Sequence, residues 1–94
     1  MALYVMFGRY SSEAVRQISA ERTKKTEEFI KRIGGKILSI YALLGGYDLV
    51  MIMELPDNKA VMKASLGLTK LLGISFNSFP AVTVEEFDKV AKDV

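Results

Sequence analysis

The chain has 94 residues, of which 50% are apolar and 26% charged, and its formal net charge is +2. This size and composition predict one ordinary globular domain spanning residues 1–94. The sequence contains neither cysteine nor histidine. Their absence excludes disulfides, thiolate chemistry, the commonest metal ligand and the most frequent general base, so we expect no metal site and no cofactor.

The charged residues do not form the pattern typical of a nucleic-acid-binding surface. Acidic and basic residues alternate at helical i,i+4 spacing, as in Glu21 with Lys25 and Glu27 with Lys31, which favours a solvated helix face. The apolar start of the chain lacks a basic segment and is too short for a signal peptide or a membrane span. We expect a soluble cytoplasmic protein that binds neither nucleic acid nor a membrane.

The first third of the chain predicts a strand and then an interrupted helix. Residues 2–8 form an apolar run rich in β-branched and aromatic side chains, which favours a strand. Ser11 or Ser12 can cap a helix that ends at Gly34-Gly35. Such a helix is longer than a strand of about eight residues, so we expect a break near residues 19–21. Its sparse inward stripe is Val15, Ile18, Arg22, Thr26, Phe29 and Ile33.

Gly45 and Gly46 separate two apolar runs and predict a β-hairpin with a two-residue turn. This register places Leu44 opposite Tyr47, and the strand period of two then defines two faces. The face expected under the helices contains Leu38, Ile40, Ala42, Leu44, Tyr47, Leu49, Met51 and Met53. The second, mixed face contains Ile37, Ser39, Tyr41, Leu43, Asp48, Val50, Ile52 and Glu54.

A second helix is predicted after the hairpin, with Asp57 as its N-cap and Gly73 after its end. Gly67 within it allows close packing against another element. Its buried stripe is expected to be Val61, Ala64, Leu68, Leu71 and Leu72.

The chain ends with a predicted strand and a short helix. Residues 74–84 predict the strand, and Pro80 indicates an edge position or a bulge because proline cannot donate to a central ladder. Residues 85–92 predict a short helix with Phe87 and Val90 facing inward.

The element order predicts an α+β fold, a ferredoxin-like split βαβ arrangement (βαββαβ plus a short C-terminal helix) with a four-stranded antiparallel sheet. Two helices can cover only one face of this sheet. The mixed face therefore predicts a homodimer or higher even oligomer, unless the terminal helix covers it. The expected interface residues are Ile37, Ser39, Tyr41, Leu43, Val50 and Ile52.

Several polar residues are candidates for function. Asp48 is expected to accept backbone N–H bonds that hold the hairpin, with acid–base chemistry or an assembly contact as alternatives. Arg9 and Tyr10, between the first strand and helix, either hold an anion or form an ordinary turn. Tyr41 could bind a polar molecule or pack at an interface, and Asn77 lines a pocket or marks a bulge.

The chain resembles the GYD domain family, named for the tripeptide found here as Gly46-Tyr47-Asp48. The similarity extends from about Tyr4 to Phe87. It includes Gly8-Arg9-Tyr10, Gly34-Gly35-Lys36, Leu44-Gly45, Glu54-Leu55-Pro56-Asp57 and Val84-Glu85-Glu86-Phe87. The resemblance implies a ferredoxin-like fold of the dimeric α/β-barrel type and no assigned activity.

The hairpin motif Gly45, Gly46, Tyr47 and Asp48 is also similar to an oligomer contact in the ligand-sensing domain of leucine-responsive regulators. Relatives by fold include cofactor-independent monooxygenases and haem-degrading enzymes, and the lack of histidine disfavours haem chemistry. We expect a binding or assembly module for a small molecule or partner. The alternatives are a cofactor-independent monooxygenase-like enzyme and a stand-alone ligand sensor, so catalytic activity stays open.

Overall fold

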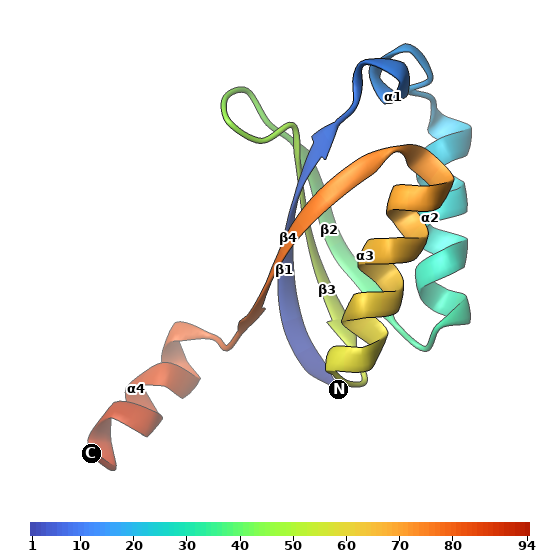
Figure 1. The fold of residues 1–94 in the computed structure, drawn as a ribbon. Helices are drawn as coiled ribbons and strands as arrows, with labels where there is room; N and C mark the ends of the chain where they lie inside the picture. The colour runs from blue at the N-terminus through green and yellow to red at the C-terminus, as the bar shows by residue number, and fades with distance from the viewer.

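The computed structural model describes residues 1–94 and contains one four-stranded antiparallel sheet with strand order β2-β3-β1-β4 (Figure 1). This is the predicted ferredoxin-like α+β arrangement. In chain order the elements are β1 (Ala2–Tyr10), α1 (Ser12–Arg16), α2 (Ala20–Arg32), β2 (Lys36–Ala42), β3 (Leu49–Leu55), α3 (Asn58–Leu72), β4 (Ile74–Ala81) and α4 (Val84–Lys92).

The predicted break in the first helix is confirmed, and each piece has its own serine cap. The Ser11 side chain accepts a hydrogen bond from the Ala14 N–H at 3.0 Å, and Ser19 accepts one from the Arg22 N–H at 3.2 Å. Because of the turn between them, α1 and α2 do not share one continuous stripe. Val15 and Ile18, predicted to face inward, are exposed, whereas Ala14 and Ile30 are buried.

Helix α3 has the predicted caps. Asp57 Oδ1 accepts a hydrogen bond from the Ala60 N–H at 2.9 Å, and Gly73 ends the helix with a φ of 72°. The predicted buried stripe is confirmed at Ala64, Leu68 and Leu72. Leu71 is exposed instead of buried, because it lies one position before Leu72 and so points away from the face that Leu72 presents to the sheet.

The predicted register between β2 and β3 is confirmed for half of the ribbon. Pairing from Ala42 opposite Leu49 to Ser39 opposite Ile52 is as expected, but a β-bulge then inserts Leu38 as an extra residue. Beyond the bulge Ile37 lies opposite Met53 and packs against the core, so its predicted place on the mixed face is wrong. Leu38, predicted under the helices, is 46% exposed for the same reason.

The connection from β2 to β3 is a wider loop than the predicted two-residue turn. Ladder pairing ends at Ala42 and Leu49, and the Leu43 N–H donates to the Asp48 carbonyl oxygen at 2.8 Å to close the loop. Gly45 takes a φ of 135°, and Leu44 is fully exposed and not paired with Tyr47. The loop projects beyond the sheet (Figure 1).

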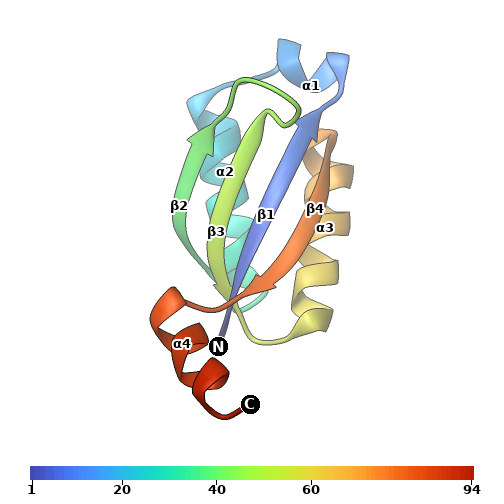
Figure 2. The same ribbon diagram turned by 90° about the vertical axis from the view of Figure 1, so that its left-hand side faces the viewer.

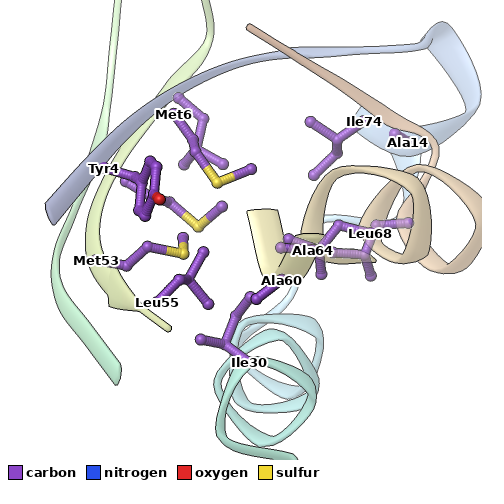
Figure 3. Close-up of a cluster of buried hydrophobic side chains, with 13 residues drawn as sticks. Tyr4, Met6, Ala14, Ile30, Met53, Leu55, Ala60, Ala64, Leu68 and Ile74 are labelled. Atoms are coloured by element: carbon purple, nitrogen blue, oxygen red, sulfur yellow. The ribbon is translucent and has the colours of Figure 1, made fainter. Parts of the chain in front are cut away.

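The hydrophobic core lies between one face of the sheet and helices α2 and α3 (Figure 3). Leu49, Met51 and Met53 of β3 alternate with half-buried Val50 and Ile52, which confirms the face predicted for this strand. The largest fully buried side chains are Met6, Ile30, Met51, Met53, Leu55 and Leu68. The opposite face, here called the open face, carries no helix over its strands (Figure 2).

Strand β4 is an edge strand, as Pro80 predicts, and it ends at Ala81. Helix α4 then lies beyond the end of the sheet, apart from α2 and α3 (Figures 1 and 2). The expectation that Phe87 and Val90 face inward is wrong, since they are 60% and 58% exposed. The chain leaves the sheet at the end of β4, so the apolar stripe of α4 has no surface of its own chain to contact. No helix has the length and apolar character needed to cross a membrane.

Candidate functional site

A cluster of aromatic and polar side chains occupies the open face near the β2–β3 loop. The Tyr47 and Phe7 rings lie 5.2 Å apart between centroids, and Phe7 and Phe79 are 6.0 Å apart in an edge-to-face arrangement. Arg9 Cζ lies 4.8 Å from the centroid of the Tyr47 ring. The Asn77 side-chain amide donates to the Tyr47 hydroxyl. These five residues are called the aromatic cluster below.

Tyr47 was predicted to belong to the core on the helix side, and this prediction is wrong. The mistaken prediction came from extending the strand alternation into residues 43–48, which form an irregular loop in the structure. The half-buried Tyr47 side chain instead connects two predicted ligand-binding residues, Arg9 and Asn77. Tyr41, a third candidate, also lies on the open face, is 58% exposed, and makes no side-chain hydrogen bond or ring contact with the cluster.

Asp48 holds the loop against β1. Its carboxylate oxygen Oδ2 accepts a hydrogen bond from the Tyr10 backbone N–H at 2.9 Å, and its own N–H donates to the Gly8 carbonyl at 2.9 Å. These two bonds continue the β1–β3 ladder beyond its last residue pair, Gly8 with Leu49. The favoured interpretation of Asp48 as an acceptor of backbone N–H bonds is confirmed.

A second region with polar groups is a cavity of about 60 Å³ between the sheet and helices α1 and α2. It is called the cleft below. Tyr10 from the end of β1 and Arg22 from α2 are its two ionisable lining residues. The apolar wall comes from Ala14, Ile18, Ile40, Leu49, Met51, Leu72 and Ile74. Of the predicted ligand-binding residues only Tyr10 lines the cleft; Arg9, Tyr41, Asp48 and Asn77 do not.

The sequence pattern predicts Arg22 only as one member of the inward helical stripe. It does not predict the position of Arg22 in the cleft. Its guanidinium donates to the Ala14 carbonyl at 3.0 Å and to the Leu72 carbonyl at the end of α3. It thus ties α1, α2 and α3 together. The signal that could have found it is a charged side chain at a position where the apolar period points inward.

The environment of Tyr10 favours its neutral form. Burial raises the pKa of the Tyr10 phenol above its ordinary value of 10.0, the negative charge of Asp48 raises it further, and Arg22 lowers it. A phenol with a raised pKa stays protonated at neutral pH. Tyr10 is therefore suited to donate a hydrogen bond, and it is a poor general base.

A wider groove of about 400 Å³ lies along edge strand β4 and helix α3. The Tyr4 hydroxyl donates to Asn58 Oδ1 at 2.9 Å within its lining, and Ser78 Oγ is buried there without a hydrogen-bond partner. Asn77 reaches both this groove and the aromatic cluster. Continuous pairing of β1 with β4 shows that Asn77 lies in a regular ladder and does not mark a bulge.

The fold and the two faces of its sheet define an α+β protein of ferredoxin-like topology. A family model for the GYD domain matches residues 4–91, and the chain therefore belongs to the GYD domain family. The predicted resemblance is confirmed over nearly its whole length. Among curated proteins, none matches this chain.

Proposed function

We propose that the protein is a homodimeric assembly module whose subunits pack through their open faces. The observation that carries this proposal is the uncovered apolar surface of the sheet. Leu3, Val5 and Phe7 of β1 lie there beside Val50 and Ile52 of β3, all half-buried by their neighbours and covered by no helix. Covering a side chain of this kind contributes roughly 1.5 to 3 kcal/mol when its burial is complete.

A second copy of the chain is the partner that best fits this face. The β2–β3 loop and helix α4 both project on the open-face side, at opposite ends of the strands (Figures 1 and 2). Two copies related by a two-fold axis through the open face would each place these projections around the other. The exposed Phe87 and Val90 of α4 would then gain an apolar surface that their own subunit does not offer.

The predicted interface residues fit this proposal with one exception. Ser39, Tyr41, Val50 and Ile52 lie on the open face, and Leu43 lies in the loop at its end. Ile37 is excluded because the bulge at Leu38 turns it to the core.

The positions of the polar candidates favour assembly over catalysis at the open face. A catalytic site needs groups that converge around one substrate in a concave pocket. Arg9 and Asn77 instead hold Tyr47, Tyr41 lies apart, and Asp48 is used by backbone N–H groups. Flat packing of two sheets needs no such convergence.

Sedimentation equilibrium at micromolar concentration tests the proposal. A mass near twice the 10.5 kDa of one chain, or a higher even multiple, supports it. A mass of one chain that persists as the protein concentration is raised contradicts it. The same samples at high salt provide a control, because an apolar interface should not weaken as ionic strength increases.

A further inference from the structure

The Arg22 guanidinium in the cleft has no carboxylate partner. The ion pairs of the structure are Arg16 with Glu13 and Lys25 with Glu21, both on helix surfaces. No acidic side chain lines the cleft. The nearby Asp48 carboxylate accepts the Tyr10 backbone N–H, and at the Tyr10 hydroxyl its negative charge is opposed by the positive charge of Arg22. A permanently charged group that is half-buried between apolar walls is stabilised by a counter-anion.

The guanidinium is also held in one position with donors to spare. A guanidinium has about five N–H donors, and Arg22 uses only one from each terminal nitrogen, on the Ala14 and Leu72 carbonyls. These carbonyls fix the plane of the side chain before any ligand arrives. Preorganised donors of this kind favour a planar acceptor such as a carboxylate.

Among the other polar groups of the cleft, the two threonine hydroxyls donate to backbone carbonyls, whereas the Ser19 and Tyr10 hydroxyls donate to no group of the protein. The Thr26 hydroxyl donates to the Arg22 carbonyl, the Thr23 hydroxyl donates to the Ser19 carbonyl, and the Ser19 hydroxyl accepts from the Arg22 N–H. The Tyr10 hydroxyl makes no hydrogen bond in the structure and is protonated at neutral pH. Tyr10 and Arg22 therefore offer donors without a matching acceptor.

We propose that the cleft binds a small aliphatic carboxylate, with its head on Arg22 and Tyr10 and its short chain against Ile40, Leu49 and Ile74. The cavity of about 60 Å³ holds roughly four to six water-sized groups. That room matches the short chain of a monocarboxylate such as butyrate. The site lies within one subunit, so it does not depend on the proposed dimer.

Methyl-region NMR titration with sodium butyrate tests this site, with sodium chloride keeping the ionic strength constant. Saturable shifts are expected at the methyl groups of Ile40, Leu49 and Ile74. The neutral isostere butyramide should bind at least about tenfold more weakly, because it lacks the charge that Arg22 recognises. Acetate should also bind about tenfold more weakly, since it lacks two methylene groups.

Two variants separate the roles of the head-group donors. Tyr10→Phe removes one hydroxyl and should weaken butyrate about threefold to tenfold. Arg22→Gln should weaken it at least about tenfold, while Lys31→Gln, which removes an exposed charge from the same helix, should leave it unchanged. The methyl spectrum of each variant without ligand reports whether its fold is intact. Should Arg22→Gln fail to fold, Tyr10→Phe and the butyramide comparison still decide the outcome.

Two results would overturn the proposal. One is the absence of saturable shifts at the cleft methyl groups up to the highest butyrate concentration that the protein tolerates. The other is equal binding of butyrate and butyramide, which would show that the cavity binds the apolar chain and does not recognise the carboxylate charge. Sedimentation of the same samples distinguishes a failure of the cleft proposal from a failure of the assembly proposal. A dimer that binds no butyrate contradicts the cleft site alone.

Discussion

The backbone of Gly67 in α3 lies directly against the ring of Phe29 in α2: a Cβ added at Gly67 would lie 2.2 Å from Phe29 Cζ. Helix propensity alone predicts that Gly67→Ala stabilises the protein by about 1 kcal/mol. The steric conflict reverses the sign, and we expect the free energy of unfolding to fall by about 1 to 3 kcal/mol. Urea denaturation measures it.

Lys63→Ala, an exposed change on the same helix, is the matched control and should have little effect. In a Phe29→Leu background the alanine at position 67 should cost less, because the side chain it meets is smaller. A higher unfolding midpoint for Gly67→Ala in the original background would contradict the close approach of the two helices.

The caps and breaks of the helices were predictable because each depends on local chemistry. Ser11, Ser19 and Asp57 accept N–H bonds within three residues, and Gly73 takes the left-handed conformation that ends α3. Pro80 indicated an edge strand from its missing N–H alone. The Asp48 bond to the Tyr10 N–H was predictable in kind, since a carboxylate at a strand end needs donors.

The sequence did not predict those features for which two neighbouring residues, or two kinds of loop, fit the local pattern equally well. Ile37 and Leu38 are both large and apolar, so no pattern shows which one the bulge leaves out of the core. Gly45 and Gly46 suit both a two-residue turn and the wider loop. The predicted position of Tyr47 depended on the two-residue turn, so it was wrong as well. The role of Arg22 could not be predicted, because the Ala14 and Leu72 carbonyls that it binds come close to it only in the folded chain.

Asp48→Ala tests the connection between the β2–β3 loop and β1. The variant removes the acceptor of the Tyr10 N–H, and a hydrogen bond to a charged group contributes about 1.5 to 3 kcal/mol. We expect a loss of that size in the free energy of unfolding and faster amide exchange at Tyr10. Asp48→Asn keeps an acceptor oxygen and should lose less, and the exposed Glu28→Ala should lose almost nothing. Unchanged exchange at Tyr10 in the alanine variant would contradict this role.

Tyr10 predicts a loss of stability in alkaline solution. Its folded pKa lies above the ordinary value of 10.0, so below pH 10 both folded and unfolded chains keep the proton and stability does not depend on this group. As the pH rises above 10 the unfolded chain releases the proton more readily, and the free energy of unfolding falls until the folded phenol also ionises. Denaturation midpoints between pH 9 and 11 measure the slope.

Tyr10→Phe should remove this contribution, and carbon NMR of the tyrosine ring in the unaltered protein should place the Tyr10 midpoint above pH 10. Arg22→Gln should move that midpoint higher still, because Arg22 is the group that lowers the pKa. A Tyr10 midpoint at or below pH 10 would contradict the burial of the phenol as the cause of a raised pKa.

Val50→Lys and Ile52→Lys probe the open face. Each places a charge in the middle of the proposed sheet-to-sheet contact, where desolvating it is unfavourable. We expect either variant to sediment as a monomer or to unfold, while Lys31→Glu on the exposed surface of α2 should leave the dimer intact. Circular dichroism at low protein concentration separates dissociation from unfolding. If both lysine variants remained folded dimers, the interface would have to lie on another surface.

Helix α4 gives the most selective test of how two copies meet, because its side chains contribute almost nothing to the core of their own subunit. Phe87 and Val90 are more than half exposed, and the helix that carries them projects on the open-face side of the sheet (Figure 1). Phe87→Asp combined with Val90→Asp should therefore leave the unfolding transition of the isolated subunit unchanged. The dimer dissociation constant should rise at least about tenfold if the partner covers both side chains.

Lys89→Glu, which changes the charge of the same helix outside its apolar stripe, is the control for the double variant and should preserve the dimer. Concentration-dependent sedimentation gives the dissociation constants directly. Equal constants for the double variant and the unaltered protein would mean that α4 stays outside the contact and that the sheet faces alone hold the subunits together. A constant raised equally by Lys89→Glu would point to charge, rather than apolar contact, as the source of the effect.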